Sequence, residues 1–187
     1  MLSEQAKNRL LKIARASVEA AAGGKRQPQF IEPYAELQGN HGCFVTLKNK
    51  GSLRGCIGCF SSDKPLWRTV QEQAVASTKH DPRFLSAPIT PEEVPQLTVE
   101  ISVLSPLRRI ENPLDLDLGK HGIVVQRGSR RGCFLPQVAT ETGWSKEEFL
   151  SRCCEGKAGL DPGAWRDPST EVLVFTAEVF HEQAENG

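Results

Sequence analysis

One short stretch of the chain, residues 43–60, constrains the fold most strongly because it is predicted to form a β-hairpin. Apolar and polar residues alternate over residues 43–48, and an Asn-Lys-Gly turn follows at residues 49–51. The second arm begins with the sequence LRGCIG, residues 53–58. We therefore predict a strand that carries a cysteine and an arginine at neighbouring positions of a sheet.

The alternation of side chains along this second arm predicts which residues act together. Successive side chains on a strand point to opposite faces of the sheet. We expect Leu53 and Ile57 to face the protein interior because they are apolar. Arg54 and Cys56 are then expected to be neighbours on the other face.

Two glycines, Gly55 and Gly58, flank the cysteine in this arm. Glycine weakens a strand unless the backbone bends or something approaches it closely. A guanidinium near a thiol favours the thiolate, which is the reactive form. The functional interpretation is a small pocket around Cys56 in which Arg54 holds an anion. The alternative is a buried cysteine that packs as a small apolar residue, with glycines that only the turn requires.

Two further residues are candidates for the same site. Glu100 is a carboxylate on a predicted strand, residues 97–104, whose other residues suit burial. If Glu100 is buried, it needs a partner such as Arg54 or His121. If that face of the sheet is exposed to solvent, Glu100 is simply hydrated. His121 opens a second predicted hairpin, where it either reaches a ligand or bonds backbone. In the catalytic hypothesis Cys56 is the nucleophile and His121 is its base. Glu100 orients that base, while Arg54 holds a carboxylate or phosphate.

The cysteine spacing argues against a metal site. Cys56 and Cys59 form a C-x-x-C, but a regular strand aims the two sulfurs at opposite faces, and a thioredoxin-type pair needs a strand-to-helix junction. A zinc site requires a second pair of ligands. Cys153 and Cys154 are adjacent on a predicted helix and diverge by about 100 degrees. We therefore predict no metal ligands, and the sequence identifies no cofactor.

The charge and hydropathy of the sequence indicate which kinds of partner and which cellular compartment to expect. The formal net charge is zero, so the molecule as a whole is not drawn to nucleic acid or anionic lipid. No run of about twenty apolar residues exists, and the first residues follow a helical pattern where a signal peptide needs a short apolar block. We expect a cytoplasmic protein, no membrane association and six reduced cysteines.

The remaining pattern predicts an α+β fold, with a mainly antiparallel sheet flanked by helices. Helices are expected over residues 3–22, from 62 or 63 to 80, over 136–142 and from 145, and strands over 97–104, 122–127 and 132–135. Residues 171–180 are apolar on both faces, which is typical of a strand in the middle of a sheet. No break in composition marks two independent domains.

Two short polar segments carry predicted turn chemistry. In residues 81–84, Asp81 is expected to accept hydrogen bonds from backbone amides and Arg83 to pin a neighbouring segment. Residues 90–93, Thr-Pro-Glu-Glu, fit a capping box that begins a short helix.

Several blocks of the chain resemble the AMMECR-one domain family, whose bacterial and archaeal members are called AmmeMemoRadiSam system protein A. In chain order the blocks are GCFVTLK from Gly42, LRGCIG from Leu53, DPRF from Asp81, LTVEISVLSP from Leu97, HGIVVQRG from His121, LPQVATETGW from Leu135 and KAGLDPGAW from Lys157. The chain departs from the family pattern just before Lys157, where Cys153 and Cys154 are adjacent and either is a candidate for the family's cysteine.

The resemblance implies a cytosolic fold of two unequal lobes over residues 3–181, the larger lobe formed by both chain ends. It also implies a genomic association with a Memo-type protein and a radical SAM protein, and it assigns no reaction. The family motif points to Arg54, Gly55, Cys56 and Gly58.

Three functions are compatible with the sequence. The leading hypothesis is a ligand or catalytic pocket at LRGCIG for a small polar or anionic metabolite, working beside a radical SAM partner. The second is a noncatalytic adaptor that docks a protein on the LRGCIG surface. The third is RNA binding through Arg127, Arg130 and Arg131, but no aromatic residues are interleaved with them as a stacking platform requires.

Overall fold

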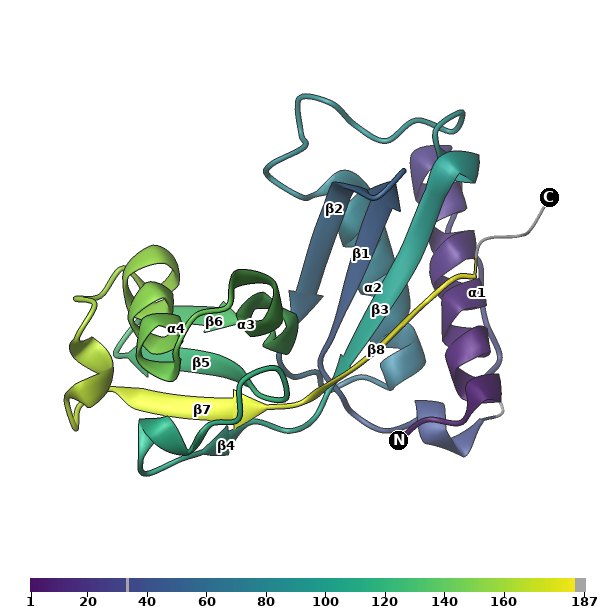
Figure 1. The fold of residues 1–187 in the computed structure, drawn as a ribbon. Helices are drawn as coiled ribbons and strands as arrows, with labels where there is room; N and C mark the ends of the chain where they lie inside the picture. The colour runs from purple at the N-terminus through teal and green to yellow at the C-terminus, as the bar shows by residue number, and fades with distance from the viewer. Residues whose placement is uncertain (33, 184–187) are drawn as a thin grey trace. The chain divides into compact units, whose positions relative to one another are not determined.

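The computed structural model describes residues 1–32 and 34–183 and has the predicted α+β fold (Figure 1). The helices are α1 (Glu4–Ala22), α2 (Leu66–Lys79), α3 (Pro136–Thr142) and α4 (Lys146–Cys153). The strands are β1 (Cys43–Asn49), β2 (Ser52–Cys59), β3 (Leu97–Leu104), β4 (Arg108–Arg109), β5 (Gly122–Arg127), β6 (Arg130–Phe134), β7 (Glu171–Phe175) and β8 (Ala177–His181). Short helical turns are η1 (Ala35–Leu37), η2 (Val94–Gln96), η3 (Pro113–Asp115), η4 (Cys154–Ala158) and η5 (Ala164–Arg166).

The chain divides into two compact units. Unit 1 comprises Met1–Leu104 and Glu178–Gly187, and unit 2 comprises Ser105–Ala177. One four-stranded sheet has the order β2-β1-β3-β8, and the other has the order β4-β7-β5-β6. No helix of the described residues is long and apolar enough to span a bilayer.

In unit 1, α1 and α2 cover one face of the sheet (Figure 1). The predicted cap of α1 is present, because the Ser3 hydroxyl accepts a hydrogen bond from the Ala6 amide at 3.3 Å. The apolar stripes of both helices pack against alternate side chains of β1 and β3, including Val45 and Leu47. The opposite face of these strands therefore carries the intervening, mostly polar residues.

The hairpin of β1 and β2 forms as predicted, but its register shifts within the second arm. Leu47 stands opposite Gly55, whereas Lys48 stands opposite Leu53, so Arg54 is an extra, bulged residue. A bulge interrupts the alternation of side chains. Leu53 consequently shares the polar face with Lys48 and is 37% exposed, and the expectation that it faces the interior is wrong.

Unit 2 is built on the predicted second hairpin, β5 and β6, with β7 paired to the other side of β5. The capping box at the start of α4 is confirmed: the Ser145 hydroxyl accepts from the Glu148 amide and the Glu148 carboxylate accepts from the Ser145 amide. Phe149 and Leu150 of α4 are fully buried in the core of this unit.

The single strand expected over residues 171–180 is two strands. β7 belongs to one sheet and β8 to the end of the other. The break falls at Thr176, whose amide donates to the Ser105 hydroxyl and whose carbonyl accepts from the Ser105 amide. An extended apolar pattern predicts that a segment pairs with neighbouring strands. It does not reveal that the first half of the segment joins one sheet and the second half joins another.

Candidate functional site

Three side chains form a row across the polar face of the unit 1 sheet. Thr46 of β1 stands directly opposite Cys56 of β2 on one side and Glu100 of β3 on the other. We call these three residues the Cys56 row. Neighbouring strands lie about 4.8 Å apart, so the backbones of Cys56 and Glu100 are about 10 Å apart. Two of the predicted catalytic residues therefore lie on the same face of one sheet.

Within the Cys56 row, the sulfur has a polar neighbour. The Thr46 hydroxyl donates to the Cys56 Sγ at 3.2 Å, and the cysteine is only partly buried. Thr46 itself is 8% exposed, which limits its freedom to turn away. Cys56 therefore differs from Cys43, Cys153 and Cys154, which are buried.

Glu100 has a partner that the sequence analysis did not consider. Its carboxylate lies 2.9 Å from the Nζ of Lys48, two residues beyond Thr46 on β1. The side chain of Glu100 is 16% exposed and that of Lys48 is 38% exposed. Of the two expected partners, Arg54 pairs with Glu93 instead, and His121 belongs to unit 2.

Arg54 is engaged by the segment that follows α2. Its Nε and Nη2 donate to the Glu93 carboxylate at 2.5 and 2.8 Å, and Nη2 also donates to the Ala87 carbonyl. The guanidinium lies 5.5 Å from the ring centre of Phe84. The ion pair raises the pKa of Arg54 and lowers the pKa of Glu93. Much of the hydrogen-bonding capacity of Arg54 is thus used inside unit 1.

A small cavity lies beside Arg54. It has a volume of about 30 Å³ and is lined by the end of α2 and by residues of the following segment, among them Phe84 and Ile89. That volume holds one or two water molecules and no metabolite. Glu93, which was expected to cap a helix, instead pairs with Arg54, and only the short turn η2 follows it.

Two side chains of the predicted turn, residues 81–84, form hydrogen bonds with the backbone of Cys56. The Asp81 carboxylate accepts from the Cys56 amide at 2.8 Å, and Arg83 donates to the Cys56 carbonyl at 3.2 Å. Asp81 and Arg83 also form an ion pair with a 2.6 Å contact. Hydrogen bonds from Arg83, assisted by the Cys56 amide, lower the pKa of Asp81 to about 2. Both outward-facing peptide groups of Cys56 are therefore held by one turn.

Close packing accounts for the two glycines that flank Cys56. A Cβ at Gly55 would lie 2.2 Å from the Ser77 carbonyl oxygen of α2, and one at Gly58 would lie 2.4 Å from the Phe44 ring. The Ser77 hydroxyl accepts from the Ile57 amide and donates to the carbonyl of Val45, the residue opposite Ile57. The helix thus anchors the strand on both sides of Cys56.

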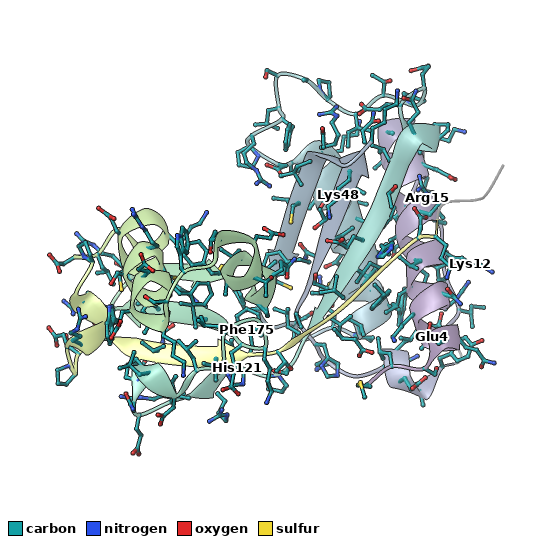
Figure 2. The ribbon with its side chains drawn as sticks, viewed as in Figure 1. Glu4, Lys12, Arg15, Lys48, His121 and Phe175 are labelled. Carbon is teal, nitrogen blue, oxygen red and sulfur yellow. The ribbon has the colours of Figure 1, made fainter. Side chains whose placement is uncertain are left out.

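His121 belongs to unit 2, whereas Cys56 and Glu100 belong to unit 1. Its Nδ1 accepts from the Asp117 amide at 2.9 Å, which assigns the ring hydrogen to Nε2. Burial lowers the pKa of His121, so the ring is neutral at pH 7. Beside it, the Phe175 ring fills the space where Gly122 has no side chain (Figure 2). This geometry fits the backbone-bonding interpretation of His121.

Cys59, Cys153 and Cys154 differ from Cys56 in the face they occupy or in their burial. Cys56 and Cys59 lie on opposite faces, as predicted, because Cys59 stands opposite Cys43. Burial raises the pKa of both Cys153 and Cys154, which makes them poor nucleophiles. Across residues 1–32 and 34–183, no three His, Cys, Asp or Glu side chains are grouped to hold a metal ion.

Arg127 and Arg130, near the β5–β6 turn, bond within unit 2. Arg127 donates to Thr170 and to the Ala164 carbonyl, and Arg130 donates to the Gly159 carbonyl. These contacts hold the guanidinium groups against the protein, which does not favour an RNA-binding surface.

The comparison with known proteins decides the family. The sequence model of the AMMECR1 family matches residues 11–180, a range that contains every candidate residue. The chain belongs to the AMMECR1 family. The resemblance drawn from the sequence blocks is therefore confirmed.

Relatives of this AMMECR1 protein match it over nearly their whole length. A protein of Methanothermobacter thermautotrophicus is 42% identical and covers 97% of this chain and 96% of its own. Protein MK0488 of Methanopyrus kandleri is 39% identical, with 95% and 89% covered. The crystal structure of the uncharacterized protein PH0010 from Pyrococcus horikoshii is 38% identical, has a TM-score of 0.87 and covers 100% of this chain and 96% of that one.

The AMMECR1 chain thus presents a thiol, a hydroxyl and an ion pair on one sheet face. Sequence reasoning nominated Cys56 and Glu100 as candidates and did not consider Thr46 and Lys48. A regular register from the turn would have put Thr46 opposite Gly55, and the bulge at Arg54 brings it opposite Cys56 instead. No local signal pairs Glu93 with Arg54, 39 residues away in the chain.

Proposed function

We propose that this AMMECR1 protein binds a small polar or anionic metabolite over the Cys56 row, with Cys56 as the nucleophile. The observation that carries the proposal is the Lys48–Glu100 ion pair at 2.9 Å, on the same sheet face as a cysteine whose sulfur is hydrogen-bonded to Thr46. A positioned thiol beside charged groups is the usual composition of a nucleophilic site.

In this proposal, the residue that binds the anion is Lys48 and not Arg54, the residue that the sequence had suggested. Arg54 is already paired with Glu93 through two hydrogen bonds. Lys48 is 38% exposed, and an ammonium has three donors, of which Glu100 takes one. Glu100 then accepts hydrogen bonds from hydroxyl or amine groups of the ligand. We leave His121 out of the reaction because its Nδ1 is already occupied.

The rigid backbone of Cys56 supports a catalytic role. Its amide and carbonyl are bonded to Asp81 and Arg83, and the next amide is bonded to Ser77. A thiol on a fixed backbone loses little orientational freedom when it attacks a bound molecule. From the family resemblance alone, we propose that the metabolite is exchanged with a radical SAM protein and a Memo-type protein.

Alkylation of Cys56 by a charged and a neutral reagent tests the proposal. Lys48→Gln should slow the reaction of iodoacetate by about threefold to tenfold and leave that of iodoacetamide nearly unchanged, because only the first is an anion. Rates at Cys56 are followed by peptide mass spectrometry, and Lys48→Arg should restore the iodoacetate rate.

Lys50→Gln is the matched control, since Lys50 is an exposed lysine of the same hairpin turn. Equal slowing of iodoacetate by the Lys50 variant, or equal slowing of both reagents by the Lys48 variant, contradicts anion binding at Lys48.

An adaptor function is the second candidate and rests on exposed apolar residues near Arg54. Leu85 is 61% exposed and lines the same small cavity as Arg54, and Leu53 is 37% exposed. If this surface docks the radical SAM partner, Leu85→Asp should abolish co-purification with it, whereas Cys56→Ser should not. If Cys56→Ser abolishes co-purification and Leu85→Asp does not, docking at Leu85 is rejected.

A further inference from the structure

A second pair of cysteines lies on the helix-covered face of the unit 1 sheet. Cys43 stands directly opposite Cys59 in the β1–β2 register, on the face that also carries Val45 and Ile57. Residues directly opposite in an antiparallel pair have Cα atoms about 4.5 or 5.5 Å apart. Both separations fall inside the range of about 4.4–6.8 Å that a disulfide spans.

Cys56 cannot take the place of Cys43 as the partner of Cys59. It lies three residues along the same strand, a separation of about 10 Å, and it points to the opposite face. The two cysteines of the C-x-x-C, Cys56 and Cys59, therefore cannot form a disulfide with each other. The partner of Cys59 is a cysteine 16 positions earlier on the neighbouring strand.

Two glycines allow the strands to approach closely at this pair. A Cβ at Gly42 would lie 2.4 Å from the carbonyl of Phe60, and one at Gly58 would lie 2.4 Å from the carbonyl oxygen of Cys43. Each glycine is adjacent in sequence to one of the two cysteines. The two cysteines themselves stand directly opposite each other across the strand pair.

The two thiols differ in access. Cys43 is fully buried, and burial raises its pKa, so it remains a thiol at neutral pH. Cys59 is partly exposed and is the sulfur that a small oxidant reaches first.

We propose that Cys43 and Cys59 form a modification site, in which hydrogen peroxide converts the thiol pair to a cross-strand disulfide. The Cys59 thiol is oxidised to a sulfenic acid as peroxide is reduced to water. The Cys43 sulfur then attacks the Cys59 sulfur, the S–O bond breaks, and a second water leaves with the Cys43 proton. In total, two thiols and one peroxide give one disulfide and two waters. This inference is independent of the proposed function, because the pair lies on the face opposite to Cys56.

Peptide mapping after peroxide treatment tests the site. The full chain is treated with hydrogen peroxide, the remaining thiols are blocked with iodoacetamide, and the protein is digested with trypsin without reduction. Cleavage after lysine and arginine should give a peptide of residues 27–48 linked to one of residues 55–68. The linked species should lack the mass of two hydrogen atoms and should separate on reduction.

Because Cys56 and Cys59 share one tryptic peptide, variants identify the linked sulfur. Cys56→Ser should retain the link to Cys43, and Cys59→Ser should lose it. Near-UV circular dichroism of the reduced variants confirms that each is folded. Peroxide should raise the Tm of the wild type and of Cys56→Ser but not that of Cys59→Ser, because the link joins the two strands.

Three outcomes would overturn the proposal. The first is a link that survives in Cys59→Ser. The second is irreversible oxidation of Cys59 to a sulfinic acid with no link to Cys43. The third is a link that forms between two molecules, detected as a covalent dimer in which the fraction linked rises with protein concentration.

Discussion

Asp81 helps to fix the geometry around Cys56. It accepts a hydrogen bond from the Cys56 amide and pairs with Arg83, and it is 3% exposed. Its low pKa means that these contacts favour the ionised carboxylate. The same contacts make Asp81 a source of pH-dependent stability.

The pH dependence of unfolding should reveal this contribution. The pKa of folded Asp81, about 2, is below that of an unfolded aspartate, so its stabilisation is fully present above about pH 4 and is lost as the pH falls toward 2. Asp81→Asn should lower the free energy of unfolding by about 2 kcal/mol at pH 7, and by much less at pH 2 to 3. Urea titrations at several pH values measure this difference.

Asp63→Asn is the control for that series, because Asp63 is an exposed carboxylate on the approach to α2. It should change the free energy of unfolding little at any pH. A loss through Asp81→Asn that is the same at pH 3 and pH 7 would mean that the charge of Asp81 contributes nothing.

The Arg54–Glu93 pair is a second stabilising contact at this scale. Both side chains are 18% exposed, so removal of one leaves the other charge half-buried and unpaired. Arg54→Ala should cost about 2 kcal/mol of unfolding free energy, and Glu93→Gln should cost a similar amount. The double variant should cost less than the two losses added, as a double-mutant cycle in urea will measure. Strict additivity would show that the pair is not coupled.

Among the secondary-structure elements, α2 determines where β2 lies. Its Ser77 bridges β1 and β2 through one hydroxyl, and its backbone fills the space beside Gly55. The position of β2 against α2 therefore depends on the Ser77 hydroxyl and on the missing side chain at Gly55.

Gly55→Ala tests this contact between helix and strand. The added methyl would meet the Ser77 carbonyl at 2.2 Å, so α2 must shift, and we expect a loss of about 1–3 kcal/mol in unfolding free energy. Gly156→Ala is the control, because a Cβ there meets nothing within 4 Å. Equal stability of the Gly55 variant and the wild type would disprove the close approach.

The elements were more predictable than the contacts between them. Helix caps and hairpins depend on neighbouring residues, and so α1, α4 and both hairpins follow from local patterns. The bulge at Arg54 and the partners of Glu93 and Glu100 depend on register and on distant segments. For this reason, the sequence nominated Cys56 and Glu100 as candidates but did not indicate Lys48 and Glu93 as the charged partners of Glu100 and Arg54.

At the scale of the whole molecule, the two units differ in how the chain builds them. Unit 2 is one continuous segment with its own sheet and core, whereas unit 1 needs both chain ends. Arg15 of α1 pairs with Glu182, just beyond β8. Unit 1 is therefore incomplete without the last strand, a division that no break in composition indicated.

A fragment of residues 105–177 should fold alone for the same reason. It should show dispersed amide signals in NMR spectra and cooperative thermal unfolding, although a domain of this size is marginally stable. A fragment of residues 1–104 should be markedly less stable because it lacks β8 and the partner of Arg15. An unfolded 105–177 fragment would show that unit 2 depends on the rest of the chain.

The turn that holds Cys56 also protects the protein against self-association. β2 is an outer strand of its sheet, and outer strands with free peptide groups recruit strands from other molecules. Asp81 and Arg83 occupy the outward amide and carbonyl of Cys56, so an incoming strand finds no donor or acceptor at that position. The strand that carries Cys56 is thereby protected at this position from pairing with a strand of another molecule.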